Sequence, residues 1–219
     1  MTDSRTQTFL FADLAGFTAL TEAHGDEEAA ELAADFCDCL RELLPDHGAD
    51  EVKTLGDAMM IRVEEPDQAI ELGLRIVEEL GTRPQFPVVR VGMHTGAAVK
   101  RGGDWFGSTV NLAARIAAAA GGNDVLLSEA TRKAAGESLD LDLDRRGERR
   151  FKNVSQSVTI YGASRSGTED EELPIDPVCR MAVNPAESAG QLRHHGETYF
   201  FCSLACAEQF AGDPGTYLR

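Results

Sequence analysis

Hydrophobic and polar positions follow two different periods along the first three quarters of the chain. Between residues 26 and 44, apolar residues recur at helical spacing and form one stripe: Ala29, Leu32, Ala33, Phe36, Leu40, Leu43 and Leu44. A second stripe predicts a helix that begins at Pro66, a residue favoured in the first turn. A third helix is expected over residues 106–122, with Gly121 as its C-cap.

Short runs rich in β-branched and apolar residues separate these helices. They predict strands at residues 6–13, 51–63, 88–99, 124–128, 151–154 and 158–163. Residues 51–63 are expected to form two strands joined by a tight turn at Leu55-Gly56. The order βαββαβαβ predicts an α/β (α+β) fold, in which helices pack on a mixed or antiparallel sheet.

A polar segment at residues 164–173 interrupts every period. It contains four consecutive acidic residues at 169–172 and precedes Pro174, so it has the character of a linker. We therefore expect one domain over residues 6–163, an acidic linker over 164–173, and a small C-terminal module over 174–219.

Composition and charge restrict the class of protein. Hydrophobic residues make up 42% and charged residues 26%, which is ordinary for a soluble globular protein. No signal peptide is evident, and the longest weakly charged run contains Arg115, so we expect no membrane span and a cytoplasmic protein. The net charge of −16 argues against nucleic acid or anionic lipid as partner. A phosphate-rich substrate would therefore need cations held by carboxylates.

Two aspartates and one glycine turn are the first candidates for chemistry. Asp13 ends the first predicted strand, just before the turn of Gly16, Phe17 and Thr18 that leads into a helix. Backbone N–H groups at such a helix start can bind phosphate. Asp57 follows the hairpin turn, and two aspartates on neighbouring strand ends can hold a pair of divalent ions.

Asn111 and Arg115 lie one helical turn apart, so an amide and a guanidinium can converge on one anion. Arg90 and Lys152 fall in strand-like segments from which they could reach phosphate oxygens. Each of these residues alone has an ordinary structural explanation, such as a turn aspartate or a solvated arginine. His94 is expected to be a packed core histidine rather than a base.

The stretches FADLAGFTAL, VKTLGDAMM, VRVGMHTGAAV and DWFGSTVNLAARI resemble, in this order, the class III adenylate/guanylate cyclase catalytic domain. The resemblance covers residues 6–163 and implies a ferredoxin-like sheet and a head-to-tail homodimer with active sites between the subunits. It implies two Mg²⁺ or Mn²⁺ ions per site, bound by Asp13, Asp57 and the backbone carbonyl of Leu14. It assigns the triphosphate to Gly16, Phe17 and Thr18, the adenine to Lys53 and Asp104, the ribose to Asn111, the transition state to Arg115, and the terminal phosphates to Arg90 and Lys152.

The pair Lys53 and Asp104 favours ATP over GTP. A carboxylate accepts from adenine N6 and a lysine donates to adenine N1, whereas guanine presents the opposite pattern. The predicted function is therefore an adenylate cyclase, a phosphorus–oxygen lyase that converts ATP to cyclic AMP and pyrophosphate. The alternatives are a catalytically silent nucleotide- or metal-sensing module and a guanylate cyclase.

The tail resembles a YHS domain over residues 174–219, on the stretches DPVCRM and YFFCSLACAEQF. Its three cysteines, Cys179, Cys202 and Cys206, are soft ligands suited to zinc, copper or iron. His194 or His195 is the expected fourth ligand. The alternative is a small domain whose reduced cysteines are partly buried and bind no metal.

Overall fold

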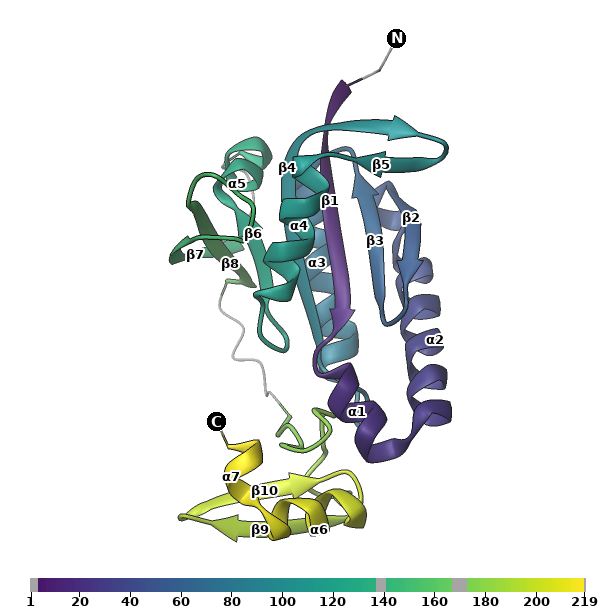
Figure 1. Ribbon diagram of the computed structural model, residues 1–219, viewed down its shortest axis with the longest axis vertical. Coiled ribbons are helices and arrows are strands. Elements are labelled where there is room, and N and C mark those ends of the chain that lie inside the picture. Colours follow the sequence, from purple (N-terminus) through teal and green to yellow (C-terminus); the bar gives the residue numbers. More distant parts are fainter. Residues whose placement is uncertain (1–3, 137–140, 167–172, 219) are drawn as a thin grey trace.

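The computed structural model describes residues 4–136, 141–166 and 173–218 (Figure 1). For Ser4 and Arg5 it describes the backbone only. A large sheet with helices on both faces forms the first part of the chain, and a small module lies at one end of it. The first part contains β1 (Ser4–Leu14), α1 (Phe17–His24), α2 (Asp26–Leu43), η1 (Pro45–His47), β2 (Ala49–Leu55), β3 (Ala58–Val63), α3 (Pro66–Gly81), β4 (Val89–Arg101), β5 (Asp104–Phe106), α4 (Ser108–Ala118), β6 (Val125–Ser128), α5 (Glu129–Ala135), β7 (Leu141–Arg149) and β8 (Val158–Arg165).

The sheet has the strand order β2-β3-β1-β4-β6-β8-β7, and β5 pairs with β4 alone. All neighbouring strands are antiparallel except β4 and β6, which are parallel. The segment from β1 to β4 is a βαββαβ unit with the order β2-β3-β1-β4, which is the ferredoxin-like arrangement. The predicted fold class and the hairpin between β2 and β3 are therefore confirmed. The turn is formed by Gly56 and Asp57, one residue later than expected, because Leu55 still pairs with Ala58.

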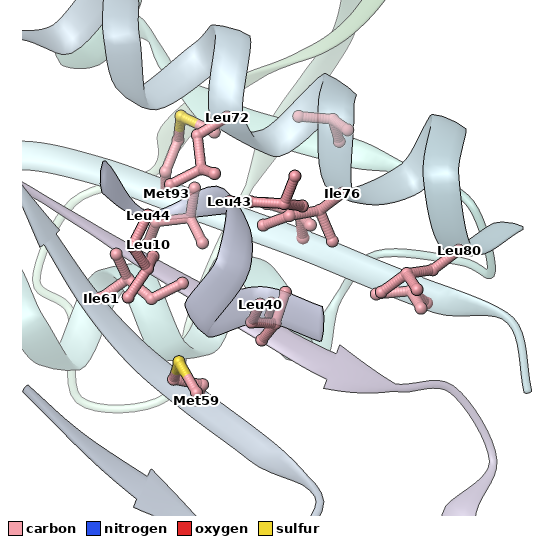
Figure 2. Packing of buried hydrophobic residues seen from close by; sticks show 14 of the residues in the cluster. Leu10, Leu40, Leu43, Leu44, Met59, Ile61, Leu72, Ile76, Leu80 and Met93 are labelled. Carbon is pink, nitrogen blue, oxygen red and sulfur yellow. The ribbon is translucent and has the colours of Figure 1, made fainter. Parts of the chain in front are cut away.

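Alternating side chains of β1 supply both faces of the sheet. Leu10 and Ala12 point into the cluster that α2 and α3 cover, where Leu40 and Ile76 meet the strands (Figure 2). Phe9 and Phe11 point to the opposite face, which α4 covers through Val110, Ala113 and Ala117. Because each face of β1 is buried by a helix, the strand is apolar at four consecutive positions, from Phe9 to Ala12.

Three details differ from the prediction. Helix α4 ends at Ala118, with Ala119 as its cap, so Gly121 is not the C-cap. Residues 151–154 form a turn closed by the Val154 N–H and the Phe151 carbonyl, not a strand. Both of these side chains pack from the turn against the cluster around Ile160, which explains their apolar character. Strands β5 and β7 and helix α5 were not predicted, because they are short or mostly polar.

Strand β8 ends at Arg165, inside the segment expected as a linker, and the acidic run at residues 169–172 lies outside the described residues. The C-terminal module contains β9 (Gly190–His194), β10 (Glu197–Phe201), α6 (Leu204–Gly212) and α7 (Pro214–Tyr217). None of the helices in the described part of the chain has the length and apolarity that crossing a bilayer requires.

The C-terminal module packs on α1 at the lower end of the sheet in Figure 1. Leu20 and Ala29 of the first part share one buried cluster with Phe201 and Phe210 of the module. Residues 85–88 also exchange backbone hydrogen bonds with residues 180–182, and Pro87 bridges to Met181. The module therefore docks next to the strand ends that carry Asp13 and Arg90.

Gly92 of β4 allows α4 to lie close to the sheet. A Cβ atom at this position would lie 2.0 Å from the backbone nitrogen of Ala117. We expect Gly92→Ala to lower the free energy of unfolding by about 3 kcal/mol, since the helix as a whole must move away. Urea denaturation followed by circular dichroism measures this change.

Gly212→Ala is the matched control, because its Cβ would meet no atom within 4 Å. This variant is expected to be at least as stable as the wild type, because Gly212 lies in helix α6, where alanine is favoured over glycine. Equal midpoints for Gly92→Ala and the wild type would contradict the close packing of α4 on β4.

Candidate active site and thiol cluster

Antiparallel pairing brings Asp13 and Asp57 to one end of the sheet. Asp13 lies opposite Ala58 of β3 on one side and opposite Arg90 of β4 on the other. The Leu14 N–H donates to the Asp57 carbonyl at 3.3 Å, which fixes the hairpin turn beside the end of β1. The Arg90 Nε donates to Asp13 Oδ2 at 2.8 Å.

The two carboxyl groups are close enough to disturb each other. Partial burial, followed by the charge of Asp13, raises the pKa of Asp57 to about 6. Arg90 compensates the charge of Asp13 but leaves a second carboxylate in the same place. A divalent cation would stabilise both carboxylates in their charged form, so the donor set fits Mg²⁺ or Mn²⁺.

The turn after β1 exposes backbone donors next to these carboxylates. Gly16 has φ +86°, a left-handed conformation that glycine adopts without strain, and it precedes the first residue of α1. No side chain caps this helix, and the first helical bond is from the Leu20 N–H to the Gly16 carbonyl. The N–H groups of the first turn of α1 are thus available to an anion.

Lys53 and Asp104 form an ion pair on the other side of the β2–β3 hairpin. Lys53 Nζ lies 2.6 Å from Asp104 Oδ2, and the Trp105 N–H donates to Asp104 Oδ1 at 2.7 Å. The hydrogen bond from Lys53 lowers the pKa of Asp104, so this carboxyl stays charged. A β-bulge at Val52 directly precedes Lys53, and bulges of this kind redirect the following side chain.

Asn111 and Arg115 lie on the outer side of α4. Leu112, Ala113 and Ile116 form the buried side of the same helix. Within the described part of the chain, neither Asn111 nor Arg115 makes a side-chain hydrogen bond or an ion pair. An amide and a guanidinium without partners, one turn apart, can both be offered to a ligand.

The predicted site residues thus fall into three groups. The first group contains Asp13, Asp57, Arg90 and the Gly16 turn. Lys53 and Asp104 form the second group, and Asn111 and Arg115 on α4 form the third.

Lys152 lies in an exposed turn rather than in a strand, and it forms no ion pair with the described residues. The prediction of its strand position was wrong, since residues 151–154 pack as a turn.

His94 behaves as a core residue, as expected. Its Nδ1 lies 2.7 Å from the Ser128 hydroxyl, and burial lowers its pKa to about 4.

The three tail cysteines converge on one point, together with a histidine of α1. Sγ of Cys179 and Cys202 are 3.3 Å apart, and those of Cys202 and Cys206 are 3.8 Å apart. His24 Nε2 lies 3.4 Å from the Cys202 Sγ and 3.9 Å from the Cys206 Sγ. All four candidate ligand atoms lie within 4.8 Å of one another.

The expectation that His194 or His195 supplies the fourth ligand is wrong. These two rings contact each other, with centroids 4.1 Å apart, and His194 also lies against Phe210. Neither belongs to the group of potential ligands, whereas His24 does. No local spacing connects residue 24 with residues 179–206, so the sequence alone offered no signal for this contact.

Two local features hold the thiols in place. Asp176, which is fully buried, accepts from the N–H groups of Val178 and Cys202 at 2.8 and 2.9 Å. The Ser203 hydroxyl accepts from the Cys206 N–H and caps α6, so Cys206 lies in the first turn of that helix. Hydrogen bonds from Cys179 and Cys202 lower the pKa of Cys206. The hydrogen bond with Cys202, followed by that with Cys206 and by burial, raises the pKa of Cys179. Cys179 lowers the pKa of Cys202, but the hydrogen bond with Cys206 and burial outweigh this effect and raise it.

The sheet is ferredoxin-like, and it carries two paired carboxylates, the Gly16 turn with its free N–H groups, and a lysine–aspartate pair. This combination is typical of the catalytic domain of a class III nucleotide cyclase. The family model described as "Adenylate and Guanylate cyclase catalytic domain" matches residues 1–163, and the "YHS domain" model matches residues 175–219. The chain therefore belongs to the adenylate and guanylate cyclase catalytic domain family and carries a C-terminal YHS domain.

Known relatives and a solved structure support this family membership. A pH-sensitive adenylate cyclase of Mycobacterium tuberculosis is 35% identical over 78% of this chain, and an adenylate cyclase of Streptomyces griseus is 32% identical over 80%. The chain spans 45% and 44% of these two relatives. The crystal structure of the adenylyl cyclase CyaB from P. aeruginosa has the same fold, with a TM-score of 0.66, 20% identity, and coverage of 79% of this chain and 99% of that one.

The raised pKa of Asp57 predicts a pH dependence of the metal-free protein. The pKa lies at about 6, above the ordinary 3.8, so the folded state holds a proton that the unfolded state releases. Stability is therefore expected to fall as the pH rises from about 4 to about 6, and to lose no more from this group above that window. Asp57→Asn should flatten the decline, which urea unfolding in the presence of a chelator measures.

Adding Mg²⁺ to the wild type should restore stability above pH 6, and Asp57→Asn should respond less. Identical pH profiles of stability for the wild type and the variant would show that Asp57 does not cause the pH dependence.

Proposed function

We propose that this chain is an adenylate cyclase, which converts ATP to 3′,5′-cyclic AMP and pyrophosphate at the interface of a homodimer. The observation that carries the proposal is the Lys53–Asp104 pair, which presents one donor and one acceptor side by side. The relatives named adenylate cyclase, at 35% and 32% identity, support the same reaction.

The choice of base follows from hydrogen bonding. The charged Asp104 accepts from the adenine N6 amino group, and Lys53 donates to adenine N1. Guanine would place its O6 and N1–H against the wrong partners. A polar group covered by the bound base without a partner is unfavourable, so these mismatches would weaken the binding of GTP.

The remaining groups have roles in the transfer of the α-phosphoryl group to the ribose 3′-oxygen. Two divalent ions at Asp13 and Asp57 would neutralise the phosphates and acidify the ribose 3′-hydroxyl. The exposed N–H groups after Gly16 bind the triphosphate, and Arg90, freed from part of its pairing with Asp13, reaches the terminal phosphates.

Asn111 holds the ribose so that its 3′-oxygen is in line with the α-phosphorus, and the bond to pyrophosphate breaks as the new bond forms. Arg115 donates to the α-phosphoryl oxygens, where one preorganised donor contributes about 10²–10³ in rate. Lys152 is assigned to the terminal phosphates on the family resemblance alone.

A dimer explains why the groups are divided within one chain. The Asp13 end of the sheet lies next to α1, whereas the β4–β5 ribbon that carries Asp104 extends from the opposite end (Figure 1). Leu55 and Phe106, two residues after Lys53 and Asp104, are 47% and 52% exposed. Such apolar side chains beside a binding site are suited to burial against a second copy.

The reaction is assigned to the cytoplasm, where ATP is abundant and where the five cysteines, none of them in a disulfide, would stay reduced. The thiol cluster is assigned to zinc before copper or iron, because three thiolates and one imidazole form a closed tetrahedral set. Metal analysis of the purified protein tests this assignment.

The first experiment measures cyclic AMP and cyclic GMP formed by the purified protein, with Mg²⁺ and with Mn²⁺. We expect cyclic AMP as the main product. In the double variant Lys53→Glu and Asp104→Cys, an acceptor replaces the donor at position 53 and the carboxylate at position 104 is removed. This variant should lose most of its activity with ATP and gain relative activity with GTP.

Asp13→Ala and Asp57→Ala should form neither product while keeping the circular dichroism spectrum of the folded protein. Faster formation of cyclic GMP by the wild type would favour a guanylate cyclase. No product under any condition would favour a catalytically silent sensing module.

The second experiment tests the shared site by mixing inactive subunits. Lys53→Ala and Asp57→Ala should each be nearly inactive alone, because both sites of either homodimer lack one group. In a heterodimer one site collects both defects and the other collects none. A random mixture contains about half heterodimers, so activity should return to about a quarter of wild type.

Heterodimers carrying two different affinity tags can be isolated and assayed directly. If they form but remain inactive, Lys53 and Asp57 serve the same subunit's site, and the head-to-tail arrangement is wrong for this protein.

A further inference from the structure

The thiol cluster is shared between two domains of the chain. Cys179, Cys202 and Cys206 belong to the C-terminal module, but His24 is the last residue of α1 in the catalytic domain. Cys179 and Cys206 are buried, and the His24 side chain is only 11% exposed. A metal bound here would therefore be held by both domains at once.

The spacing of the ligand atoms agrees with tetrahedral coordination. Zn–S bonds of 2.3 Å and Zn–N bonds of 2.0–2.1 Å place sulfur atoms about 3.8 Å apart and sulfur about 3.6 Å from nitrogen. Four of the six separations are 3.3 and 3.8 Å between Sγ atoms and 3.4 and 3.9 Å between His24 Nε2 and Sγ, and the other two, from the Cys179 Sγ, lie within 4.8 Å. A metal ion fits between these atoms with only small side-chain shifts.

His24 is oriented as a metal ligand. Its Nδ1 lies 3.0 Å from a carboxylate oxygen of Glu28, which lies in the first turn of the next helix, α2. When Nδ1 carries the proton and donates to Glu28, Nε2 presents its lone pair to the thiols. A carboxylate behind the imidazole is the usual second partner of a metal-binding histidine.

The thiol cluster is connected to the Gly16 turn in two ways. Helix α1 begins after Gly16 and ends at His24, so a metal at His24 fixes the far end of this helix. Arg180, the neighbour of Cys179, lies against the turn, since a Cβ at Gly16 would be 2.6 Å from the Arg180 Cγ. The Arg180 carbonyl also accepts from the Val88 N–H at 3.2 Å, just before β4.

We propose that a zinc ion bound by His24, Cys179, Cys202 and Cys206 fastens the C-terminal module to the catalytic domain and thereby holds α1 and the Gly16 turn in place. Binding releases the protons of the remaining thiols, because zinc is bound by thiolate. The consequence for nucleotide binding rests on the proposed function, whereas the metal site and the docking do not.

Metal affinity provides the first test. Reduced full-length protein is titrated with Zn²⁺ against a chromophoric chelator, and one ion per chain is expected. His24→Gln should weaken zinc binding by at least about tenfold, since removal of even an outer partner of a ligand costs 10–100-fold. His194→Gln makes the same chemical change on an uninvolved imidazole and should bind zinc like the wild type.

A second variant covers the case in which His24→Gln unfolds. His24→Cys keeps four ligands, and with Co²⁺ its thiolate-to-metal absorption should be stronger than that of the wild type, because a fourth thiolate joins three. An unchanged Co²⁺ spectrum in His24→Cys, or unchanged zinc affinity in His24→Gln, would overturn the assignment of His24.

Hydrogen–deuterium exchange tests the docking without any nucleotide. Zinc should slow the exchange of residues 17–24 and 178–182 in the wild type and in His194→Gln, but not in His24→Gln. Slower exchange confined to residues 178–206 would show that the ion stabilises the module alone, which would overturn the docking.

The link to catalysis is measured separately. If the proposed function holds, zinc should lower the KM for ATP in the wild type and leave it unchanged in His24→Gln. Slower exchange of α1 in a protein that forms no cyclic nucleotide would refute the cyclase proposal and leave the zinc site intact.

Discussion

The pairing of β1 between β3 and β4 is the constraint on which the rest of the structure depends. This strand is covered by α2 and α3 on one face and by α4 on the other, so its position is fixed from every side. Its last residues place Asp13 between the hairpin that carries Asp57 and the start of β4 that carries Arg90. The carboxylate pair is therefore positioned by backbone hydrogen bonds and not by flexible side chains alone.

The distribution of charge is compatible with the anionic substrate of the proposed reaction, although the protein as a whole is acidic. The net charge of −16 repels a triphosphate at long range, but the potential near the site depends on local groups. Arg90 and the uncapped start of α1 supply positive charge and donors beside Asp13, and the carboxylates of Asp13 and Asp57 are suited to divalent ions. In the proposed function, these two carboxylates would therefore help an acidic protein to bind phosphate through divalent ions.

Helix α1 connects the two chemical centres of the chain. Its first turn offers backbone donors beside Asp13, and its last residue faces the thiol cluster. Leu20, in the middle of the helix, is buried against the C-terminal module. The proposed zinc ion would therefore act on the same helix whose first turn faces Asp13.

The sequence by itself determined the fold class, the β2–β3 hairpin and the start of α3 at Pro66, because these follow from local periodicity and short motifs. The family resemblance added the candidate residues of the cyclase site. The turn at residues 151–154 could not be predicted, since apolar side chains such as Phe151 pack equally well from a turn or a strand. The pairing of Asp13 with Arg90 and the bulge before Lys53 depend on strand register, which local sequence does not specify. Only the tertiary structure brought His24 to Cys202, because two surfaces 178 residues apart in the chain meet there through buried side chains of Leu20 and Phe201.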